Sequence, residues 1–172
     1  DCAYAIACHI GDKKAVDRIK QLRQLDEKHH LALVCEDLSQ IATYAKVDNE
    51  AYRILKSHTP GPYTFILKAS KEVPKKLLHP KKKTIGLRVP NNVIALAILK
   101  ELGEPMLSSS LILPNETFPL TDPYDIRQTL EHSLDLVIDG GYCGMEVTSL
   151  VSLVDGEVEV LRQGMGDTSA FI

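Results

Sequence analysis

The chain has 172 residues, of which 44% are hydrophobic and 25% are charged, and its formal net charge is −3. This length suits one domain with a substantial core, and the composition is that of an ordinary globular protein. No apolar run reaches the roughly 18–20 residues that a membrane-spanning helix needs, and no secretory leader is recognisable. We therefore expect a cytoplasmic protein without a membrane partner. Because the chain opens without Met on an apolar, strand-like run, we also expect an upstream segment.

Alternating helices and strands predict an α/β fold with helices packed on a sheet. After the opening strand, apolar residues at i, i+1, i+4 and i+7 favour a helix, and short β-branched runs favour strands. Helices are predicted at 12–25, 37–45, 49–57, 93–102 and 122–134. Strands are predicted at 31–35, 63–68, 84–89, 105–110 and 134–138, and in a final hairpin of 148–154 and 157–161.

Capping and turn residues support these boundaries. Asp37 is a suitable helix N-cap, and Pro123 takes the favoured first position of its helix. Gly103 follows the helix at 93–102 as a C-terminal glycine. The pair Asp155-Gly156 is a strong hairpin signal between the last two strands.

Positive charge is concentrated between Lys68 and Arg88. This segment contains seven lysines and one arginine against a single acid, Glu72, so it carries +7 and the rest of the chain carries −10. A solvated lysine-rich loop is one interpretation, and an attractor for phosphates or nucleic acid is the other.

Cationic and hydroxyl side chains follow several apolar strands, where α/β proteins place ligands. Each has a structural alternative: a solvated strand end, a helix cap or a surface ion pair. Taken together they suit an anionic ligand, because arginine binds carboxylate and phosphate in a bidentate manner. The set consists of Arg88, Ser108, Ser109, Ser110, Thr148, Ser149 and Arg162, with Arg23 near the end of the first helix.

Other catalytic machinery is weakly indicated. The sequence has no GxxxxGK[ST] loop, no GxGxxG after a strand and no HExxH motif. A catalytic thiol is possible, but reduced, buried cysteines are favoured because the four cysteines lack CxxC or zinc-like spacing. They are Cys2, Cys8, Cys35 and Cys143.

A series of motifs covers almost the whole chain and resembles the YrdC family, most closely its YciO branch. The motifs in order are DCAYAIAC, TPGPYTFIL, GLRVP, LGEPMLSSS, LVIDGG and LRQG. The resemblance implies one YrdC-like domain over 1–172, with a twisted mixed sheet and flanking helices around a positively charged cavity. It also implies that an N-terminal helix and strand precede Asp1.

The resemblance implies a threonylcarbamoyl-AMP synthase-like activity. L-threonine and bicarbonate would form a carbamate that attacks the α-phosphate of ATP, with Mg²⁺ accompanying the nucleotide and pyrophosphate leaving. The product would serve the t6A modification of tRNA. The alternative is a protein that binds double-stranded RNA, tRNA or nucleotide without synthase chemistry.

The resemblance also assigns roles to residues. Substrate contacts are expected from Tyr4, Arg88, Thr148 and Ser149. Nucleotide contacts are expected from Arg23, Ser108, Ser110 and Arg162, with Arg23 and Arg88 as the catalytic cations. RNA contacts are expected from Lys75, Lys76, Lys81, Lys82 and Lys83, and no protein metal site is expected. The chain departs from the synthase pattern at Leu25, Ile112 and Ser152, where that pattern has a cation, an asparagine and an aspartate.

Overall fold

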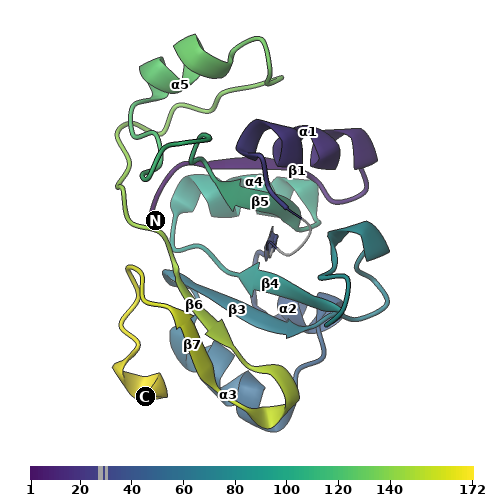
Figure 1. Ribbon diagram of the computed structural model, residues 1–172. Coiled ribbons are helices and arrows are strands. Elements are labelled where there is room, and N and C mark those ends of the chain that lie inside the picture. Colours follow the sequence, from purple (N-terminus) through teal and green to yellow (C-terminus); the bar gives the residue numbers. More distant parts are fainter. Residues whose placement is uncertain (27–28, 30) are drawn as a thin grey trace.

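The computed structural model describes residues 1–26, 29 and 31–172. Its described strands form one mixed, twisted and open sheet in the order β1-β5-β2-β4-β3-β6-β7 (Figure 1). The pairs β2·β4 and β3·β6 are parallel and the others are antiparallel. The strands are β1 (Ala5–His9), β2 (Ala32–Val34), β3 (Tyr63–Lys68), β4 (Thr84–Arg88), β5 (Met106–Ser110), β6 (Ser149–Ser152) and β7 (Glu159–Arg162).

Five α-helices accompany this sheet within the described residues. They are α1 (Lys13–Arg23), α2 (Leu38–Tyr44), α3 (Asn49–His58), α4 (Val93–Leu102) and α5 (Pro123–Leu130). Three short 3₁₀ helices complete the fold: η1 (Lys75–Leu77), η2 (Val154–Gly156) and η3 (Ser169–Phe171). The α/β architecture and the twisted mixed sheet predicted from the sequence are confirmed.

Side-chain caps define the helix boundaries. Asp12, Asp37, Asp48 and Asp122 each accept a hydrogen bond from a backbone N–H in the first turn of α1, α2, α3 and α5, respectively. Gly103 ends α4 with a φ of 69°, in the left-handed region that glycine adopts without a steric penalty.

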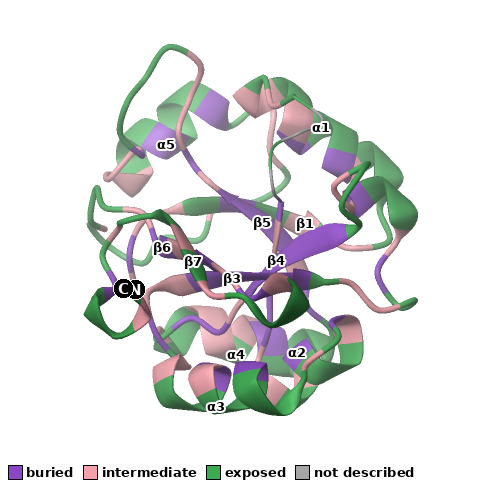
Figure 2. Cartoon of the chain, turned by 60° about the horizontal axis from the view of Figure 1, so that its bottom comes forward, coloured by how far each residue is buried: buried purple, intermediate pink, exposed green. Residues whose placement is uncertain are grey.

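Two apolar clusters hold the layers together. Figure 2 shows α2, α3 and α4 together on one side of the strands, with α1 and α5 across from them. The larger cluster joins Leu33, Phe65 and Leu87 of the sheet to Ile41 of α2 and Leu55 of α3, all fully buried. The smaller cluster joins β1, α1 and α5 through Ile6, Ile19, Leu111, Ile126 and Leu130.

One predicted strand, at 134–138, is wrong. Helix α5 ends at Leu130, and the segment that follows is irregular, with Leu136 74% exposed and Ile138 45% exposed. An apolar run becomes a strand only where a neighbouring strand offers backbone partners, and none of the described sheet pairings includes this segment. The predicted final hairpin is confirmed, with η2 between its two strands.

No helix within the described ranges is long and apolar enough to cross a membrane.

Candidate functional site

The basic segment of the sequence separates into two features along β4. Arg88 ends the strand, whereas the exposed Lys81–Lys83 run precedes Thr84 at the other end. The four residue steps of this strand span about 13 Å. Within the segment, Lys76 pairs with Asp17 at 2.7 Å. The lysines and Arg88 therefore do not form one patch.

Arg88 is engaged in a buried ion pair. Its Nη2 donates to Oδ1 and Oδ2 of Asp1 at 2.6 and 2.7 Å, and the backbone N–H of Asn91 donates to the same carboxylate at 2.8 Å. The two charged side chains are only 15% and 10% exposed. Burial lowers the pKa of Arg88. Its Nε is buried without a hydrogen-bond partner among the described residues, so one donor remains unused.

Arg162 is fixed by the residue that precedes β6. Its Nε and Nη2 donate to the backbone oxygen of Thr148 at 3.0 and 2.8 Å, and Nη2 also reaches Thr148 Oγ1 at 3.2 Å. The Thr148 hydroxyl is in turn 2.7 Å from the Thr64 hydroxyl on β3. Both threonines are 7% exposed, so their hydroxyl groups are nearly removed from solvent, whereas Arg162 itself is exposed.

Arg23, at the C-terminal end of α1, is the second anchored guanidinium. Its Nε donates to the backbone oxygen of Ile112 at 3.0 Å, and its Nη1 donates to the Ser109 hydroxyl. Burial lowers the pKa of Arg23, and the positive charge of Arg162 lowers it further. The charges of the two guanidinium groups therefore oppose each other. Neither is ion-paired with a carboxylate in the described part of the chain, and such a pair of cations suits a bound oxyanion.

The serine that contacts Arg23 is not one of the two assigned to the nucleotide. Side chains alternate between the faces of a strand, so Ser109 points away from the face that carries Ser108 and Ser110. Ser109 shares its face with Ile6 of β1, its register partner. The two-residue period of the strand is the signal that separates Ser109 from its neighbours. Ser108 is buried and Ser110 is half-buried, and their nucleotide roles stay predictions.

Two residues predicted to contact the substrate, Tyr4 and Ser149, form hydrogen bonds with backbone groups of the protein itself. The Tyr4 hydroxyl donates to Gly141 O at 2.5 Å and accepts from Gly140 N at 3.0 Å. The fully buried Ser149 hydroxyl donates to a backbone oxygen at Gly166 and accepts from the N–H of Gly164. Their substrate roles also stay predictions, and the hydrogen bonds described here position loops.

Two of the three departures from the synthase pattern, Leu25 and Ile112, have structural counterparts. Gln24 ends α1 in the left-handed region with a φ of 52°, and Leu25 then packs against the larger apolar cluster. The backbone oxygen of Ile112, rather than its side chain, binds Arg23. Leu25 therefore serves the core, while the arginine two residues before it serves the candidate site.

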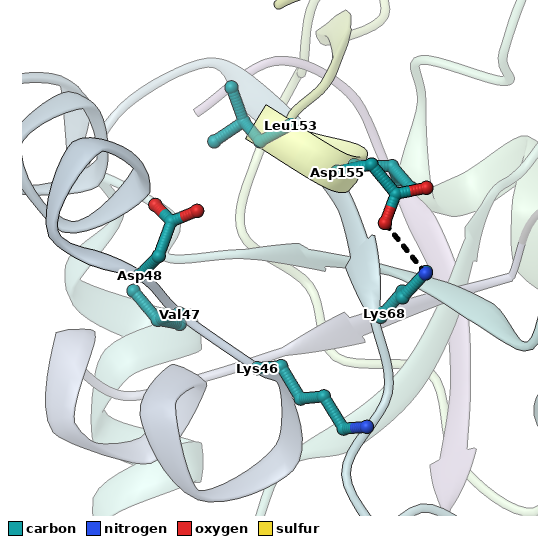
Figure 3. A pocket seen from close by; sticks show the side chains of 7 residues that line it. Lys46, Val47, Asp48, Lys68, Leu153 and Asp155 are labelled. Atoms are coloured by element: carbon teal, nitrogen blue, oxygen red, sulfur yellow. Dashed lines mark ion pairs between the residues drawn. The ribbon is translucent and has the colours of Figure 1, made fainter. Parts of the chain in front are cut away.

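A surface pocket of about 340 Å³ lies away from this cluster, at the opposite end of β3 from Thr64 (Figure 3). Lys68 pairs with Asp155 at 2.6 Å, and Asp48 caps α3 through Ala51 N. The two cations and two anions of this pocket balance, so it does not provide the positive field expected for a phosphate site. It is lined by Lys46, Val47, Asp48, Lys68, Leu153, Val154 and Asp155.

The chain is similar to proteins that bear the name of a synthase and to proteins that do not. The chain is 27% identical to a putative threonylcarbamoyl-AMP synthase of Methanocaldococcus jannaschii, over 96% of this chain and 77% of that protein. Pyrococcus abyssi Sua5, solved in complex with L-threonine, is 23% identical. Its TM-score is 0.85, over 95% of this chain and 48% of that one, and this likeness concerns the fold.

The agreement with Escherichia coli YciO, an uncharacterized protein, is stronger. The two sequences are 51% identical over all of this chain and 84% of the relative, and the crystal structure of that protein matches with a TM-score of 0.96. The model of the Sua5/YciO/YrdC family, described as telomere recombination, matches residues 1–164. On these grounds the chain belongs to the Sua5/YciO/YrdC family.

Proposed function

We propose that this protein is a threonylcarbamoyl-AMP synthase-like nucleotidyltransferase. The observation that carries the proposal is the pair Arg23 and Arg162, two cations that are anchored by oxygen atoms of the protein and are not neutralised by a described carboxylate. An enzyme that handles a triphosphate needs such a site, because its substrate and transition state carry several negative charges. Distant relatives that bear the name of this synthase support the proposal.

The proposed reaction proceeds in two steps. The amine of L-threonine takes up bicarbonate and releases water, which gives a carbamate. A carbamate oxygen then attacks the α-phosphorus of ATP, the bond between that phosphorus and the α–β bridging oxygen breaks, and pyrophosphate leaves with the electron pair. No covalent bond to the protein forms. The protein therefore contributes positioning and charge neutralisation, which are the main terms in phosphoryl-transfer catalysis.

Arg23 and Arg162 would hold the phosphates. Arg88, whose charge is already balanced by Asp1, would offer its unused Nε donor to the substrate carboxylate or the reacting α-phosphate. Within the described residues no group of three or more His, Cys, Asp or Glu is placed to hold a metal ion. Mg²⁺ commonly binds through substrate phosphates and keeps several waters, so this donor set is consistent with Mg²⁺ entering as MgATP. When bound, the ion would neutralise charge on the phosphates.

The test is pyrophosphate release from L-threonine, bicarbonate and MgATP, with direct detection of the adenylate. We expect threonine-dependent release that falls by about 10²-fold in Arg162→Ala, because one preorganised charged donor is lost. Arg18→Ala is a suitable control, because it also removes a guanidinium, but one that pairs with the exposed Asp135 at 3.1 Å. Release that is independent of threonine, or equal in all three proteins, would count against the proposal.

A second candidate function is binding of RNA without synthase chemistry, and it is supported by the exposed Lys81–Lys83 turn. Each phosphate contact lowers the logarithm of the binding constant by about 0.7–0.9 per tenfold rise in salt. Substitution of the three lysines by glutamine should flatten this slope and leave pyrophosphate release intact. An RNA affinity that does not change with salt would exclude the second candidate.

A further inference from the structure

Thr64 lies between the two separate cation environments of the candidate site. Its hydroxyl meets the Thr148 hydroxyl at 2.7 Å, and Thr148 holds Arg162. On the other side, β3 and β4 pair Phe65 with Leu87 and Ile66 with Gly86. One step further along this antiparallel register, Thr64 stands opposite Arg88 and on the same face of the sheet.

The position of Thr64 is sterically fixed. A Cβ atom built on Gly86 would lie 3.1 Å from Thr64 Cγ2, so the glycine leaves just enough room for the threonine methyl group. The β-branched side chain also has few rotamers available on a strand. The hydroxyl is therefore held toward Thr148 by packing as well as by hydrogen bonding.

The hydroxyl groups of Thr64 and Thr148 carry two protons, and the described residues accept only one of them. Nη2 of Arg162 donates to Thr148 Oγ1, and one hydroxyl proton is used in the bond between Thr64 and Thr148. The other hydroxyl proton has no acceptor among the described residues, and both threonines are nearly buried. The buried Nε of Arg88, on the neighbouring strand β4, is a further donor without a partner among the described residues. Unused buried donors are costly, and an oxyanion supplies acceptors for them.

We propose that Thr64 is a positioning residue for anion binding, which acts by orienting Thr148 and, through it, the guanidinium of Arg162. This inference deepens the proposed function and rests on it. The ligand class is an oxyanion, phosphate or carboxylate, that accepts from the spare hydroxyl proton and from Arg162. Thr64 tunes the affinity for this anion without supplying charge.

The test uses isothermal titration of inorganic pyrophosphate into the full chain. Thr64→Val preserves the branched shape and removes the hydroxyl, and Thr64→Ser keeps the hydroxyl. We expect binding about tenfold weaker in Thr64→Val, which is the effect of one misaligned charge-assisted hydrogen bond, and within about twofold of the parent in Thr64→Ser. In a double-mutant cycle, adding Thr64→Val to Thr148→Val should cost no further affinity.

Thr84→Val is the control for a general effect of losing a buried threonine hydroxyl, because Thr84 is 1% exposed at the other end of β4. It should leave pyrophosphate binding unchanged. The inference is overturned if the parent chain does not bind pyrophosphate, if Thr64→Val binds like the parent, or if Thr64→Ser is as weak as Thr64→Val. Thr64-dependent binding without threonine-dependent synthesis would overturn the proposed function alone. Synthesis that is indifferent to Thr64→Val would overturn this inference alone.

Discussion

Removal of the Asp1 carboxylate should destabilise the protein far more than removal of an exposed one. Asp1 accepts two hydrogen bonds from Arg88 and one from Asn91 N, and both charged side chains are mostly buried. In Asp1→Ala the guanidinium loses its carboxylate partner and keeps a contact to Gly61 O at 3.4 Å, and Nε stays unpaired. Truncating one partner of a buried ion pair costs about 3–5 kcal/mol, because the other charge stays buried.

This loss can be measured as a shift of the melting temperature. For a domain of this size, each kcal/mol lowers Tm by about 2–4 °C, so Asp1→Ala should melt about 10 °C below the parent. Asp135→Ala is the matched control, since its ion pair with Arg18 is 88% exposed on the acid side and should be worth less than about 1 kcal/mol. Urea titration gives the same comparison as a free energy of unfolding.

The double variant Asp1→Leu with Arg88→Met tests whether the loss of stability in Asp1→Ala comes from the unpaired charge of Arg88. Two apolar side chains leave no unpaired charge, so the double variant should be more stable than Asp1→Ala. The reasoning is refuted if Asp1→Ala and Asp135→Ala melt at the same temperature, or if the double variant is the least stable of the three.

Three further predictions concern other parts of the fold. Leu136→Ser should change the free energy of unfolding by less than about 0.5 kcal/mol in urea titration, because the side chain is 74% exposed; a loss above about 2 kcal/mol would instead indicate that Leu136 is buried, as in the predicted strand. Burial raises the pKa of Cys35 from 9.0 to about 12, so the folded state favours the thiol. The stability that this provides is complete below about pH 9 and is lost as the pH rises toward 12, and Cys35→Ala should show a flatter decline in stability above pH 9. Gly86→Ala places a methyl group against Thr64, and it should cost about 1–3 kcal/mol in urea and weaken pyrophosphate binding; unchanged binding would show that Thr64 is not held by this contact.

Local sequence signals predicted those helices and strands whose end residues form caps or turns. Asp37 caps α2 and Gly103 ends α4, as expected, because both act on the adjacent turn of backbone. The segment at 134–138 is also followed by turn residues, Asp139-Gly140-Gly141, but a turn does not supply a neighbouring strand. Its apolar residues fit a buried strand, but whether a strand forms depends on a partner far away in the chain, which composition does not reveal.

The candidate site was predictable in its residue types and less so in their arrangement. The residues of the proposed anion site, Arg23 and Arg162, are among those expected, and so is Thr148. Thr64 was missed because it lies inside an apolar strand, where a threonine is commonly explained by its β-branched shape. Its role depends on the pairing of β3 with both β4 and β6, so only the sheet register brings it to the site.

The two parts of the basic segment should respond differently to salt, because one is buried and the other is exposed. Arg88 interacts with Asp1 at 2.6 Å in a mostly desolvated environment, where mobile ions screen weakly. The lysines at 81–83 lie in solvent, and at 0.15 M salt their field extends only about 8 Å. Contributions of Arg88 should therefore depend on geometry and fail on a single substitution. Contributions of the lysines should depend on summed charge, decline gradually with each substitution, and fade as salt is added.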